Sequence, residues 1–133
     1  MKSIFCVILL ALVGIIGCTK TTTVNATTDL VGTWEWVHTT GGVAKVNETP
    51  KTLGYTYKVT YTKEGRFLQY DKDNKLISDQ SYFTTGGISV LDSQSHNMIT
   101  LDSTTNFSYA IREDSLILYQ EVYQAYIKTF VKK

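Results

Sequence analysis

Apolar and polar residues alternate along most of the chain after residue 28, in short segments separated by turn-forming residues. Trp34 and Trp36 share one face of the first segment, and Thr33 and Glu35 share the other. Successive side chains of a β-strand point to opposite faces of its sheet, so this pattern predicts half-buried strands. Strands are predicted at 30–39, 55–62, 66–70, 76–84, 88–91, 96–101, 107–112, 115–120 and 124–132.

The segments between these strands carry turn residues. Lys63-Glu64-Gly65 predicts a tight hairpin, because glycine supplies the positive φ that such turns need. The loop after the first strand contains Gly41-Gly42 and Pro50, the single proline. Apolar residues between 119 and 127 also fall at helical spacing, which leaves a helical turn open there. Strand-type residues and the lack of helix caps favour strand, loop, strand.

The predicted fold class is all-β, a single antiparallel meander in one domain, residues 29–133. Eight or nine short strands leave exposed sheet edges unless the sheet closes on itself. We therefore expect a barrel of about eight strands, whose interior is filled by side chains or holds one small ligand.

The first residues have the features of an export signal. A basic start, Met1-Lys2-Ser3, precedes an uncharged apolar stretch over 4–16 and the pair Gly17-Cys18. This stretch is shorter than the roughly 20 residues that a membrane span needs. We expect 1–17 to be a signal peptide and 18–28, in which six of the ten residues after the cysteine are Thr, to be a flexible tether.

Ile15-Ile16-Gly17-Cys18 resembles the lipobox of bacterial lipoproteins; the alternative is an ordinary signal peptide with an incidental cysteine. The resemblance implies cleavage before Cys18, its lipidation and a membrane anchor. Cys6 would be lost on cleavage, so the mature chain could form no internal disulfide. Thr19 follows the cysteine without an acidic cluster, which by analogy favours the outer membrane and its periplasmic face.

Gly32-Thr33-Trp34 resembles the Gly-x-Trp signature of lipocalins. The segments 30–36, 59–67, 114–118 and 129–133 together are similar to lipocalin-like lipoproteins common in Bacteroidetes. The resemblance implies a lipocalin-like barrel whose base Trp34 closes, with a basic residue of the last strand packed on it. Lys132 stands where the family usually has Arg, and an ammonium stacks less well than a planar guanidinium.

Function is predicted less sharply than fold. The first hypothesis is a lipoprotein that binds a small hydrophobic or amphipathic ligand in the barrel. The alternative is a structural or interaction lipoprotein with a filled barrel, which binds another envelope protein through the loop 40–52. The candidate ligand-binding residues, which could equally be core, are aromatic: Trp36, Tyr57, Tyr61, Tyr82 and Tyr109.

Other chemistry is not indicated by the sequence. Without Lys2 the chain has 13 − 1 = 12 basic and 12 acidic residues, which gives no sign of nucleic-acid binding. His38 and His96 have no other ligand at metal-binding spacing. We therefore expect no enzymatic activity, no metal and no cofactor. The third hypothesis, after ligand binding and protein binding, is an enzyme that uses carboxylates at the barrel mouth. Asp-Ser pairs at 102–103 and 114–115 resemble O-glycan acceptors of Bacteroidetes envelopes, or are simply turns.

Overall fold

The structure, a computed structural model, describes residues 29–133. The predicted signal peptide, Cys18 and the tether lie outside the described residues. The described residues form one antiparallel sheet with one short helix, and their bounds are as follows: β1 (Gly32–Gly41), β2 (Val46–Glu48), α2 (Pro50–Leu53), β3 (Lys58–Tyr61), β4 (Arg66–Tyr70), β5 (Leu76–Ile88), β6 (Ser95–Leu101), β7 (Thr105–Arg112), β8 (Ser115–Gln120) and β9 (Tyr126–Lys132).

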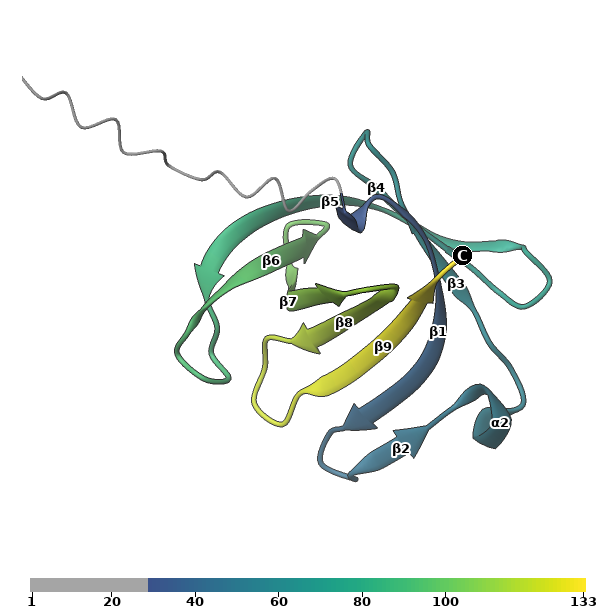
Figure 1. Ribbon diagram of the computed structural model, residues 1–133, viewed down its shortest axis with the longest axis horizontal. Helices are drawn as coiled ribbons and strands as arrows, with labels where there is room; N and C mark the ends of the chain where they lie inside the picture. The colour runs from purple at the N-terminus through teal and green to yellow at the C-terminus, as the bar shows by residue number, and fades with distance from the viewer. Residues whose placement is uncertain (1–28) are drawn as a thin grey trace, which may run out of the picture.

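The sheet closes into an eight-stranded barrel (Figure 1). From β3 to β9 each strand pairs with the next, and β1 pairs with β3 on one side and β9 on the other. The short strand β2 adds only to the far end of β1, at Thr39 to Gly41. Closure gives every barrel strand two neighbours, so no long edge is left unpaired. The predicted all-β meander barrel is confirmed, and its shape is consistent with a lipocalin-like barrel.

The strand predicted at 88–91 is wrong, and so is the break before it. β5 runs unbroken through Gly86-Gly87 and ends at Ile88, and a turn follows. Gly87 pairs with His96, and a Cβ on Gly87 would lie 3.2 Å from the side chain of Met98. The glycine therefore continues the ladder and gives Met98 room to pack over it.

The second predicted strand is shorter than expected, because β3 begins only at Lys58. The chain before it leaves Gly54 in a left-handed conformation, with φ +75°. It then binds β1 by two hydrogen bonds: the Trp36 N–H to the Tyr57 carbonyl at 3.0 Å and the Thr56 hydroxyl to the Trp36 carbonyl at 3.1 Å. A β-bulge in the β1–β9 pairing falls at the same place, between Trp36 and His38. Because of this local irregularity, the regular β1–β3 ladder stops at the pair Glu35–Lys58 and does not include residue 57.

The region 119–126 follows the favoured prediction. β8 ends at Gln120, a turn follows, and β9 begins at Tyr126. The first predicted strand is shifted by two residues, since β1 begins at Gly32 and Leu30 precedes it. Residues 29–133 contain no helix that is long and apolar enough to cross a membrane.

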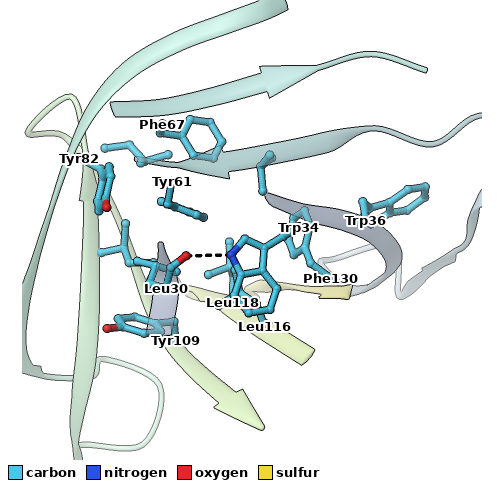
Figure 2. Close-up of a cluster of buried hydrophobic side chains, with 13 residues drawn as sticks. Leu30, Trp34, Trp36, Tyr61, Phe67, Tyr82, Tyr109, Leu116, Leu118 and Phe130 are labelled. Carbon is cyan, nitrogen blue, oxygen red and sulfur yellow. Dashed lines mark hydrogen bonds between the residues drawn. The ribbon is translucent and has the colours of Figure 1, made fainter. Parts of the chain in front are cut away.

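The core fills the base of the barrel, where β1 begins and β9 ends. Trp34 and Leu30 are fully buried, and the Trp34 indole N–H donates to the Leu30 carbonyl at 2.9 Å (Figure 2). Tyr61 packs at the same level, with its ring centroid 5.0 Å from that of Tyr82 and 5.3 Å from that of Phe67. Leu30 thus seals the base from below, and its carbonyl stays satisfied although buried.

Candidate functional site

The open end of the barrel holds a cavity of about 670 Å³. It lies above the core, between the inward residues of β1, β4 and β9 and the segment 46–57 that crosses the mouth. Its volume falls in the range of small-molecule sites, which runs from roughly 300 to 1,000 Å³. The barrel is therefore filled at its base and open at its mouth.

An aromatic stack forms one wall of this cavity. The centroids of the Trp36 and Tyr57 rings lie 5.3 Å apart, at an interplanar angle of 12°. Tyr55 also stacks on Trp36, at a centroid distance of 6.2 Å and an angle of 26°. Trp36 is fixed by its indole N–H, which donates to the Thr39 hydroxyl at 2.8 Å. The two hydrogen bonds between Trp36 and the segment 56–57 hold the stack together. Trp36 itself is only 1% exposed, so the rings of Tyr55 and Tyr57 form the accessible part of this wall.

The rim beside this wall is built by β2 and α2, which the sequence did not predict. Thr49 caps α2: its hydroxyl accepts from the Thr52 N–H, and the Thr52 hydroxyl accepts from the Thr49 N–H at 2.8 Å. Pro50 occupies the first turn, where its missing N–H costs nothing. The usual capping box ends in Glu or Gln, so the Thr-x-x-Thr form here is a weak sequence signal.

A cation lies inside the mouth. Lys128 of β9 pairs with Thr39 and Leu118, and it shares a face with the buried Phe130 two residues on. It is half-buried and lines the cavity. Burial lowers the pKa of Lys128, and the nearby Glu48 carboxylate partly offsets this. Lys128 was not among the sequence candidates, although it has the inward parity of Phe130.

The β4–β5 turn supplies acidic residues at the rim. Asp71, Lys72 and Asp73 line the cavity, and the Lys72 ammonium donates to Asp73 at 2.7 Å. The Asp71 carboxylate accepts from the backbone N–H groups of Asp73 and Lys75, each at 2.9 Å. These rim charges are largely neutralised within their own turn. The hairpin that the sequence predicted here is present.

The predicted ligand-binding residues divide between the cavity and the core. Trp36 and Tyr57 line the cavity. Tyr61, Tyr82 and Tyr109 pack in the core around Trp34 instead (Figure 2), and burial raises the pKa of each of these three phenols. Trp36 belongs to the same buried cluster and also lines the cavity. The structure therefore brings two of the five candidates together at the mouth.

The two residues expected to close the base are in contact. The Lys132 ammonium lies 5.4 Å from the Trp34 ring centroid, within the range of a cation–π interaction. The lysine thus occupies the place that the resemblance assigns to an arginine.

Metal-binding and carboxylate clusters are not formed by the described residues. No group of three or more His, Cys, Asp and Glu side chains within 29–133 could hold a metal ion. His38 contacts Asn47, and His96 contacts Asp92 at 2.8 Å. The buried polar residues of this part of the chain are Thr39, Ser89 and Ser108, so no pair of buried carboxylates converges there.

Comparison with known proteins adds no family: no protein-family model matches the chain, and no curated protein matches it significantly. Function is therefore argued from the barrel and its cavity.

Proposed function

We propose that this protein binds a small amphipathic molecule in the open end of its barrel. The observation that carries the proposal is the cavity of about 670 Å³ beside the stacked rings of Trp36 and Tyr57. An apolar ligand body would lie against the rings of Tyr55 and Tyr57, which cover the buried Trp36, and gain about 25 cal/mol for each Å² of apolar surface removed from water. The rings are already held in place, so little ordering free energy opposes binding.

Polar groups at the same site would orient the ligand. The Thr39 hydroxyl accepts from Trp36 and keeps its own hydrogen to donate. Gln69 also lines the cavity and offers both a donor and an acceptor. A few polar groups among aromatic walls are typical of sites that bind amphipathic molecules.

The location is part of the proposal. We infer from the sequence that the chain is cleaved before Cys18 and anchored by lipid at the outer membrane, on its periplasmic face. The lipobox-like segment 15–18 and the Thr-rich segment after it support this. An anchored binding protein of this kind would hold its ligand close to the envelope without crossing it.

Native mass spectrometry of the protein, purified gently from its own bacterium's envelope, tests the binding function. Extra mass that disappears on denaturation is the expected result, and its value identifies the ligand. Tryptophan emission provides a second readout, because Trp36, although buried, lines the cavity and Trp34 does not. A bare mass, with no emission change on adding lipids or bile-salt-like amphiphiles, would contradict the proposal.

A pair of variants on β4 localises the binding. Gln69→Phe adds a ring inside the cavity, and we expect it to weaken ligand binding about tenfold or more, since a filled cavity has no room for the ligand. Leu68→Phe adds the same ring one residue earlier, on the outward face. The control should bind like the wild type in a fluorescence titration. Equal affinity in both variants would place the ligand elsewhere.

A second candidate function, binding of another envelope protein, is favoured by two exposed tips beside the mouth. Val43 is 80% exposed on the β1–β2 turn, and Tyr123 is 90% exposed on the β8–β9 turn. The turns are adjacent, because the Gly42 N–H donates to the Ala125 carbonyl at 3.1 Å. Site-specific photo-crosslinking from position 123 in cells tests this candidate. A crosslinked product that is absent when the crosslinker stands at the exposed Lys63, outside the loop 40–52, would support it.

A further inference from the structure

The ammonium of Lys128 is the one feature of the cavity that apolar binding does not use. Within residues 29–133 its Nζ makes no hydrogen bond and no ion pair. The other cavity ammonium, Lys72, is paired with Asp73. A half-buried charge without a partner costs free energy, so a binding site is one of the few places where it is useful.

The Lys128 Nζ is also open to a ligand. In the described part of the chain, every fully buried side-chain nitrogen has a hydrogen-bond partner. Lys128 has none, so its Nζ is not fully buried, and its side chain lines the cavity. Its neighbours across the ladder are Thr39, which binds Trp36, and Leu118 of the core. The charge therefore lies beside the aromatic wall rather than out on the rim.

We propose that Lys128 binds the anionic head group of the ligand, so that the protein selects amphiphiles bearing a carboxylate or a similar anion over neutral or cationic ones. This inference rests on the proposed binding function and names the class of ligand. The apolar body lies against Tyr55 and Tyr57, and the Lys128 ammonium donates to the head group. The Thr39 hydroxyl can supply a second hydrogen bond to the same anion.

Burial and the Glu48 carboxylate shift the pKa of Lys128 in opposite directions. Burial lowers the pKa of Lys128, which shows that its ammonium is poorly solvated and would gain from an anionic partner. Glu48 on β2 is close enough to affect Lys128 but forms no ion pair with it. Charge-assisted hydrogen bonds in such partly desolvated surroundings are stronger than those in water. Glu48 therefore leaves the ammonium available to an incoming anion.

The test compares three ligands with one chain length: dodecanoate, dodecanol and dodecyltrimethylammonium, each titrated into the full mature protein. We expect the wild type to bind dodecanoate about tenfold or more tightly than dodecanol, and the cation most weakly. Lys128→Met should bind dodecanol as the wild type does and lose the preference for dodecanoate. Lys128→Arg should keep the preference, and Lys75→Met, a control at an exposed lysine that does not line the cavity, should behave like the wild type.

Each other outcome overturns the inference in a distinct way. Undiminished dodecanoate binding by K128M would leave the cavity as a binding site but remove Lys128 from it. Loss of dodecanol binding as well would show that Lys128 supports the cavity wall. A preference for the cation would assign selectivity to the acidic rim. Displacement of dodecanoate by equimolar acetate would indicate a site for free anions, and no binding of any ligand would overturn the proposed function too.

Discussion

Trp34 and Trp36 point into the same barrel from the same strand, yet their surroundings differ. The Trp34 ring is enclosed on all sides, with Leu30 below it and Lys132 over its face. Trp36 is also buried, but the rings of Tyr55 and Tyr57 stack on it and it lines the cavity. The height of a side chain along the barrel axis thus decides whether an aromatic residue packs in the base or beside the cavity.

Closure of the base should depend more on the indole hydrogen bond than on the cation. Trp34→Phe leaves the buried Leu30 carbonyl without its donor and opens a small cavity, so we expect a loss of about 2–4 kcal/mol in the free energy of unfolding. Lys132→Met removes only the contact over the ring, a loss of about 0.5–1 kcal/mol. Urea unfolding of the two variants measures both. A larger loss for K132M would reverse this ranking.

Residue alternation predicted which aromatic side chains point inward but not how high each lies. Tyr57 and Tyr61 have the same parity, and one lines the cavity while the other is core. The height of a side chain along the barrel axis depends on how neighbouring strands are staggered. The stagger is set by pairings between residues far apart in sequence, such as Tyr82 with Leu101. Parity alone would have identified Lys128 as inward, two residues from Phe130. Lysines mostly lie at the surface of proteins, and Lys128 was not among the candidates.

At the scale of elements, the loop between β5 and β6 is held against the end of β8 by a polar cluster. The Glu121 carboxylate accepts from the Ser89 hydroxyl at 2.9 Å and from the Val90 N–H at 2.7 Å. Ser89 and Ser108 are buried beside it. Burial raises the pKa of Glu121, but hydrogen bonds from Ser108, the Val90 N–H and Ser89 outweigh burial and hold this pKa below its ordinary value.

This cluster should make the stability of the barrel sensitive to acid. A carboxyl whose pKa is lower in the folded state stabilises the fold fully above its ordinary pKa of 4.5, and this stabilisation is lost as the pH falls through the lowered value. Glu121→Gln should cost about 1 kcal/mol at neutral pH, because uncharged hydrogen bonds are weaker, and it should flatten the loss below pH 4.5. Urea titrations at several pH values measure both effects. The exposed Glu113→Gln is the control, and an acid response as steep as that of the wild type would exclude Glu121 as its source.

Elements with strong local signals were predicted well, and elements that depend on distant contacts were not. The bounds of β4 and β8 are those expected from alternation and flanking turns. The strand β5 continues through Gly86-Gly87 because its partner β6 supplies the ladder, which the sequence of β5 alone does not show. The strand β2 and helix α2 have only three and four residues. They exist because they pair with the end of β1 and cap themselves, so periodicity over a window could not find them.

At the scale of the molecule, the two ends of the barrel have separate tasks. The described chain enters at the base, where Leu30 seals the core, and the cavity opens at the other end. The proposed anchor at Cys18 would therefore attach on the side of the base. Membrane attachment and ligand binding should then be separable by mutation, because neither relies on the residues of the other.

Cys18→Ala tests that separation on the full chain. The alanine has no thiol to accept a lipid, so we expect the protein either to keep its signal segment or to leave the membrane fraction, with a matching change in mass. Its barrel begins at Gly32, fourteen residues later, and the purified variant should bind the wild-type ligand with unchanged affinity. Cys6→Ala, in the predicted signal segment, is the matched control and should leave anchoring intact. Membrane attachment of C18A with the wild-type mass would refute the anchor. Loss of binding by a correctly folded C18A would instead show that the residues before the barrel help to hold the ligand, and the two ends would no longer be independent.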